Sequence, residues 1–111
     1  LRTTGIAESA LAERLGDLAS AVDGLPVASL PGIEGCDLRV TARGLAPDDA
    51  DRALDAATAK LRDRAGRVVY GEAGQDLAAL VLDACRARDL RIAVAESCTG
   101  GLLGARLTAV A

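Results

Sequence analysis

The sequence predicts a mixed α/β protein, and three observations lead to that class. Two segments carry apolar residues at helical spacing, several short runs are apolar or alternating over strand length, and Gly and Pro separate them. The 111 residues are enough for one domain or for one and a fraction. Because Tyr70 is the only aromatic residue and Met is absent, the core must be built from aliphatic side chains.

Two helices are predicted in the first part of the chain. The first covers residues 6–20, and Gly24 and Pro26 end its pattern. Its apolar stripe consists of Leu11, Leu15, Leu18 and Val22. The second opens at Pro47, where proline suits the first turn and two following acids favour the positive end of the helix dipole. Its stripe consists of Ala50, Leu54, Ala57, Leu61 and Ala65.

Three short strands complete this part, which gives the order α-β-β-α-β. The predicted strands are Val27–Leu30, Asp37–Arg43 and Val68–Tyr70, and a hairpin joins the first two through Gly32–Gly35. In the second strand, Leu38, Val40 and Ala42 alternate with polar residues, so one face is expected in the core and the other in solvent. The sequence therefore predicts one small α/β domain over residues 1–71.

Basic residues crowd the last turns of the second helix and form the best nucleic-acid candidate in the sequence. Cations at a helix C-terminus also complement the helix dipole, and that explanation accounts for the whole cluster. The net charge of −3 argues against broad electrostatic capture of nucleic acid or of an anionic membrane. The sequence thus disfavours nucleic-acid binding. The cluster comprises Lys60, Arg62, Arg64 and Arg67.

The boundary to a second unit is predicted at Gly71–Gly74, and the predicted second domain covers residues 72–111. It is predicted to contain a helix at Gln75–Arg88 with Cys85 in its core, a strand at Leu90–Ala95 and a helix starting near Thr99. One strand and two helices cannot cover both faces of a sheet. We therefore expect this domain to be incomplete and the chain to be a piece of a longer protein.

The turn after the predicted strand, residues 96–101, carries the candidate chemistry. Backbone N–H groups collect unpaired where a strand leads through glycines into a helix, and such groups bind anions or a developing oxyanion. Ser97 is the candidate nucleophile, and Gly100 and Gly101 permit close approach of a carbonyl or phosphate. Cys98 is a rival, but no adjacent cation activates its thiol. A purely structural strand-to-helix connection is the alternative, since no histidine is present to act as base.

These same residues resemble a known family. The string AESCTGGLL at 95–103, followed by ARLT at 105–108, is similar to the signature that opens the C-terminal domain of the CinA family of competence- and damage-inducible proteins. Residues 1–15 (LRTTGIAESALAERL) and 37–44 (DLRVTARG) resemble the small KH-like middle domain of that family. KH domains that bind nucleic acid use a GXXG loop, whereas Gly5 is followed by Ile-Ala-Glu.

The resemblance implies a function for the parent protein. The C-terminal domain is similar to nicotinamide mononucleotide (NMN) deamidases, in which the serine of the motif is assigned a catalytic role, assisted by a lysine and a tyrosine of a later YSN-x-x-K-like segment. Ser97 matches that serine, and Glu96, Cys98, Thr99, Gly100 and Gly101 match the surrounding substrate-binding turn. The later segment and the family's N-terminal domain do not occur in these residues, so the 111-residue chain alone is expected to be inactive. No cofactor is implied.

The remaining expectations concern environment and partners. Cys36, Cys85 and Cys98 form no C-x-x-C pair and histidine is absent, so a zinc site is not expected and reduced thiols in a cytoplasmic protein are the simplest account. No apolar run is long enough to span a bilayer. The partners expected are NMN and further copies of the protein in a homodimer or higher oligomer. The alternative function is a non-enzymatic connector or dimerisation module with a KH-like fold.

Overall fold

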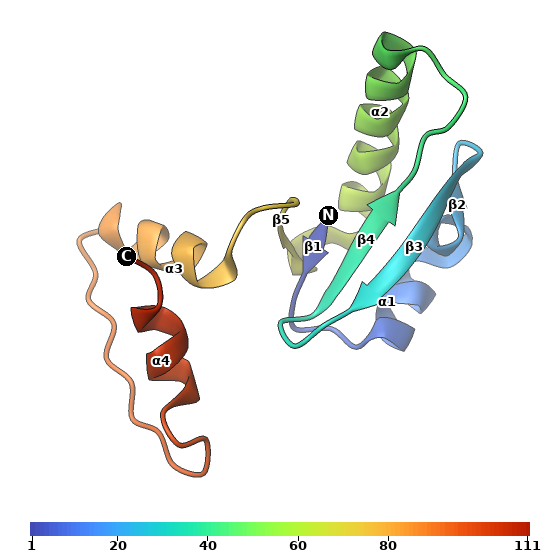
Figure 1. Ribbon diagram of the computed structural model, residues 1–111. Coiled ribbons are helices and arrows are strands. Elements are labelled where there is room, and N and C mark those ends of the chain that lie inside the picture. The colour runs from blue at the N-terminus through green and yellow to red at the C-terminus, as the bar shows by residue number, and fades with distance from the viewer. The chain divides into compact units, whose positions relative to one another are not determined.

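A computed structural model describes residues 1–111 and confirms the mixed α/β class (Figure 1). The chain divides into two compact units, Leu1–Ala73 and Gly74–Ala111. Unit 1 contains a five-stranded sheet and two α-helices, and unit 2 contains two further helices.

The elements of unit 1 follow one another closely, with short 3₁₀ turns at Gly16–Ala19 and Gly66–Val68. Both predicted helices are present, but the first is shorter than residues 6–20, because its apolar pattern continues past the point where the helix ends. The helix stops at Gly16, which has φ 60°, and Val22 of the same stripe lies in a strand instead. The elements are β1 Arg2–Thr3, α1 Glu8–Leu15, β2 Ala21–Val22, β3 Leu25–Pro31, β4 Cys36–Val40, α2 Pro47–Ala65 and β5 Val69–Gly71.

The sheet has the order β2-β3-β4-β1-β5, and all neighbouring strands are antiparallel. The predicted hairpin is confirmed: β3 pairs with β4 from Val27 opposite Val40 to Pro31 opposite Cys36. The predicted order of elements along the chain, α-β-β-α-β, was wrong at its start, because the strand β1 precedes α1. In the sheet, β1 lies between β4 and β5. Arg2 and Thr3 have no apolar pattern, and what makes them a strand is their pairing with Asp37 and Val69.

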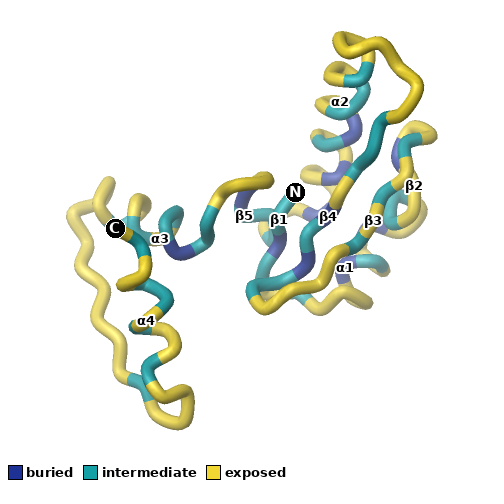
Figure 2. Tube along the Cα trace, in the orientation of Figure 1, coloured by how far each residue is buried: buried dark blue, intermediate teal, exposed yellow.

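Both helices of unit 1 cover the same face of the sheet, and the core lies between (Figure 1). α2 confirms its prediction: Pro47 occupies the first turn, acids follow it, and Gly66 with φ 67° ends it. The buried residues of α2 are Ala57, Leu61 and Ala65, which lie in its C-terminal half. The buried core comprises Leu11, Leu15, Val22, Cys36, Leu38, Ala57, Leu61 and Ala65, all aliphatic or thiol side chains as the composition requires (Figure 2).

Unit 2 consists of α3, Leu77–Arg86, and α4, Leu102–Thr108, which contact each other. The predicted strand at Leu90–Ala95 was wrong: the segment forms no strand, and Leu90, Ile92 and Val94 are all exposed. A strand needs a neighbour to accept and donate backbone hydrogen bonds, and no second strand exists in residues 74–111. Cys85 is half-buried rather than part of a core, since Ala78 is the only buried residue of this unit.

Gly35 lies where the backbone of Thr3 and Thr4 passes close to the hairpin. A Cβ at this position would lie 1.9 Å from the carbonyl oxygen of Thr3, because β1 crosses the hairpin closely there. Gly35→Ala must therefore displace β1 from the sheet, and we expect it to lower the free energy of unfolding of the chain by about 2–4 kcal/mol in urea denaturation.

Gly5→Ala is the matched control. Gly5 also has a positive φ, but nothing lies within 4 Å of its added Cβ. It should cost only the backbone strain of about 1 kcal/mol. Equal losses in the two variants would show that the close approach of β1 contributes nothing.

Candidate functional site

The turn at residues 96–101 connects the extended segment 90–95 to α4 and has an unusual backbone. Cys98, Gly100 and Gly101 have φ values of 69°, 64° and 91°. Glycine adopts such angles without strain, whereas a cysteine does so at a cost. This sequence of left-handed residues folds the chain back sharply, so that Glu96 reaches the start of the helix that follows.

The Glu96 carboxylate accepts hydrogen bonds from three groups of the turn and of α4. Its Oε1 accepts a hydrogen bond from the Gly104 N–H at 2.7 Å, and its Oε2 accepts from the Leu103 N–H at 2.9 Å and from the Thr99 hydroxyl at 2.8 Å. The backbone amides of Gly104 and Leu103, followed by the Thr99 hydroxyl, hold the pKa of the Glu96 carboxyl below its usual range. The carboxylate thus occupies the positive end of α4 from within the chain.

Ser97 and Cys98 lie side by side on the outside of this turn. Both are exposed, and the Ser97 Oγ lies 3.9 Å from the Cys98 Sγ. Within unit 2, no basic side chain forms a hydrogen bond with Ser97. The single lysine, Lys60, belongs to unit 1, where its Nζ lies 2.6 Å and 2.7 Å from the carboxylate oxygens of Asp23. Unit 2 therefore exposes a hydroxyl and a thiol and supplies neither with a basic side chain.

The backbone amides of residues 98–101 differ from those at the start of α4. None of these four N–H groups donates to an acceptor within the chain, whereas the Leu103 and Gly104 amides bind Glu96. Gly100 and Gly101 have nothing within 4 Å of the position of a Cβ, so their backbone is open to an approaching molecule. Successive N–H groups in such a turn can stabilise an anionic oxygen.

Asp76 braces the two helices of unit 2 and was not predicted from the sequence. It caps α3 by accepting a hydrogen bond from the Ala79 N–H at 2.9 Å, and it forms an ion pair with Arg106 of α4. The Arg106 guanidinium, followed by the Ala79 amide, lowers the pKa of the Asp76 carboxyl. An Asp directly before an apolar helix pattern was the available signal, but the predicted helix began at Gln75, two residues before the first residue of α3.

The basic cluster of unit 1 is largely neutralised by acids. Besides the Lys60–Asp23 pair, Arg62 lies 2.7 Å from Glu72, and Arg64 lies 3.8 Å from Asp17. Charges engaged in this way present a weaker field to a phosphate backbone than unpaired cations. The geometry therefore favours the interpretation of these residues as surface ion pairs around the end of α2.

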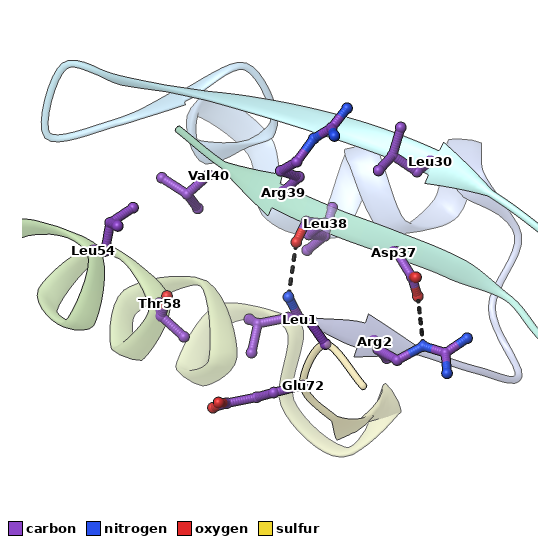
Figure 3. Close-up of a pocket in the computed structure, with 11 residues that line it drawn as sticks. Leu1, Arg2, Leu30, Asp37, Leu38, Arg39, Val40, Leu54, Thr58 and Glu72 are labelled. Atoms are coloured by element: carbon purple, nitrogen blue, oxygen red, sulfur yellow. Dashed lines mark hydrogen bonds and ion pairs between the residues drawn. The ribbon is translucent and has the colours of Figure 1, made fainter. Parts of the chain in front are cut away.

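Unit 1 also has a pocket of about 360 Å³ between β4 and α2 (Figure 3). Leu38, Val40 and Leu54 form much of its apolar lining, and the Leu1 nitrogen donates to the Leu38 carbonyl at 2.8 Å. At its polar end, Arg2 Nε lies 3.3 Å from Asp37 Oδ1. This pocket contains none of the residues predicted for the site.

Neither a cluster of metal ligands nor a helix able to cross a membrane is found in residues 1–111. Across residues 1–111, no group of three or more His, Cys, Asp or Glu side chains is arranged to hold a metal ion. None of the helices combines the length and apolar character needed to cross a bilayer.

Comparison with known proteins assigns both units. Residues 1–71 match the family described as "Damage-inducible protein CinA KH domain", and residues 74–111 match "CinA C-terminal domain". A CinA-like protein of Gemmatimonas aurantiaca is 60% identical over 110 residues, and one of Prochlorococcus marinus is 49% identical over 111 residues. One from Dictyoglomus thermophilum is 36% identical over 110 residues. The matches cover 99% of this chain but only 26%, 25% and 27% of those three relatives, so the chain spans about a quarter of their length.

The Asp76 brace gives a pH-dependent prediction. Asp76→Asn keeps a capping side chain but loses the charge that pairs with Arg106, whereas Asp76→Ala loses both. At neutral pH, we expect the thermal unfolding midpoint of the helices to fall in the order wild type, Asn variant, Ala variant, as followed by circular dichroism.

The sign of the pH effect follows from the lowered pKa of Asp76. The stabilisation is complete above the pKa of the unfolded chain and is lost as the pH falls through the lower folded value. The wild type should therefore converge on the Asn variant in acid. A difference between the two that grows on acidification would contradict the ion pair.

Proposed function

The chain belongs to the CinA family, and on that premise we propose that the full-length gene product is an amidohydrolase that converts NMN and water to nicotinate mononucleotide and ammonia. The observation that carries this proposal is the turn at residues 96–101. It presents an exposed hydroxyl directly before four backbone amides that have no acceptor within the chain. Amide hydrolysis needs both of these components, a nucleophile and donors for the oxyanion.

In the proposed reaction, Ser97 is the nucleophile. Its Oγ attacks the carboxamide carbon, and the proton of the hydroxyl passes to a base. The carbon–nitrogen bond then breaks, the leaving nitrogen takes a proton and departs as ammonia, and water hydrolyses the resulting ester to the carboxylate. The amides of residues 98–101 would stabilise the negative oxygen of each tetrahedral intermediate.

The base must come from residues outside this chain. Lys60 is bound to Asp23 in unit 1, and no other lysine or histidine is present. A lysine and a tyrosine of the YSN-x-x-K type, which the family resemblance implies, would meet this need. For the same reason the 111-residue chain by itself should release no ammonia from NMN.

The glycines and Thr99 suit the substrate side of the turn. Because no atom lies within 4 Å of the position of a Cβ at Gly100 or Gly101, the planar nicotinamide ring and its carboxamide can approach the backbone directly. The Thr99 hydroxyl points its proton at Glu96, so towards a ligand it offers its oxygen as an acceptor. Unit 1 would then serve for packing and connection, in keeping with its paired surface charges.

Ammonia release from NMN by the full-length gene product tests this proposal. Ser97→Ala removes the nucleophile and should lower kcat by at least about 1,000-fold. Cys98→Ala is the matched control at the neighbouring exposed position, and it should keep the activity within about tenfold, because the thiol has no part in the reaction.

The opposite pattern would overturn the assignment of Ser97. If Cys98→Ala abolished ammonia release while Ser97→Ala kept it, the thiol would be the nucleophile. A folded wild-type protein that releases no ammonia from NMN would refute the proposed activity altogether.

A further inference from the structure

Glu96 forms hydrogen bonds that connect the start of the candidate turn, residues 96–101, to residues further along the chain. Its carboxylate is bonded to Thr99, Leu103 and Gly104, at 2.8, 2.9 and 2.7 Å, and all of these lie beyond Ser97 in the chain. The backbone from 97 to 101 is therefore fastened at both ends. Charge-assisted bonds of this kind to backbone N–H groups are stronger than neutral ones.

The enclosed backbone has a reason to need such fastening. Cys98 has φ 69°, an angle that costs a side-chain-bearing residue of order 1 kcal/mol or more. Ser97 and Cys98 are exposed, so packing does not hold them. The bonds to Glu96 tie this segment to α4, together with two backbone bonds, from the Leu102 N–H to the Thr99 carbonyl at 3.3 Å and from the Ala105 N–H to the Gly101 carbonyl at 2.8 Å.

We propose that Glu96 is a positioning residue, which holds the Ser97 hydroxyl and the amides of residues 98–101 in one arrangement by fastening the turn to α4. This inference rests on the proposed function for its catalytic consequence, but its structural content can be measured without activity. It also replaces the sequence-based expectation that Glu96 binds substrate.

Two alternative roles for Glu96 fit the geometry less well. Both carboxylate oxygens already accept hydrogen bonds from the chain, so contact with substrate would require breaking them. A role as the base for Ser97 is disfavoured, because its donors favour the ionised form and make it reluctant to take a proton.

Gly104 offers a way to disturb the contact without changing the charge. A Cβ there would lie 3.2 Å from Glu96 Oε1 and 3.7 Å from Val94, so Gly104→Ala should push the carboxylate away. Alanine is the better helix former, and α4 itself should not be weakened by this change. Damage from Gly104→Ala is therefore attributable to the displaced carboxylate.

The experiment uses the full-length gene product with Glu96→Gln, Gly104→Ala and the control Asp83→Asn. Asp83 is an exposed acid of the same unit whose partner is Arg86. We expect Glu96→Gln to lower kcat for NMN on the order of 100-fold with KM changed less than about threefold, because the reacting groups are misplaced rather than removed. Gly104→Ala should act in the same direction, and the control should match the wild type.

Amide hydrogen exchange of a peptide covering residues 97–104 provides the readout that is independent of activity. Exchange should be faster in Glu96→Gln and Gly104→Ala than in the wild type, while peptides of α1 and α2 stay unchanged. Unchanged exchange at 97–104 in both variants would overturn the proposal. So would a raised KM with an unchanged kcat, which would identify a substrate contact.

The proposed function and the positioning role of Glu96 are refuted by different results. If the wild-type protein releases no ammonia from NMN, the proposed function fails, and hydrogen exchange alone then decides the role of Glu96. If the wild type is active but Glu96→Gln and Gly104→Ala are equally active, the proposed function stands and the positioning role is refuted.

Discussion

The organisation of the candidate site depends on one carboxylate bound to the first amides of a helix. The start of α4 is a place where an anion is favoured, and Glu96 fills it from within the chain. As a result, the donors left for a ligand are not those of the helix but those of the preceding turn, residues 98–101. This distinction separates the part of the backbone that maintains the structure from the part that is available for chemistry.

In unit 1, the buried residues maintain the fold and charged residues at the surface pair with one another. Its core is assembled from small and aliphatic side chains on one face of the sheet, and its charged residues are arranged in pairs around α2. The Thr3 hydroxyl, which is buried, donates to the Cys36 carbonyl at 2.6 Å and so helps to hold β1 beside β4. No buried side-chain nitrogen or oxygen atom of the unit lacks a hydrogen-bond partner.

The sequence predicted the elements whose signals are local. α2 was predicted because a long apolar stripe, Pro47 and the following acids agree with one another. β1 was missed because Arg2 and Thr3 become a strand only by pairing with residues more than 30 positions away. The segment 90–95 was mistaken for a strand because an apolar run reports burial preference, not the presence of a neighbour. Such long-range pairings leave no trace in a local pattern.

The same limit applied to the site. The motif located the turn and drew attention to Ser97, but the role of Glu96 depends on three left-handed residues that bring it to Leu103 and Gly104. Spacing along the chain does not reveal such a contact. No base was predicted from the sequence, because histidine is absent and the single lysine, Lys60, is paired with Asp23.

Attack of Ser97 on the carboxamide can be tested by peptide mapping with mass spectrometry after NMN turnover is stopped with acid. We expect the peptide containing residues 96–101 to carry the acyl group of the nucleotide as an ester on Ser97. An adduct on Cys98 instead, formed while ammonia is released, would contradict it.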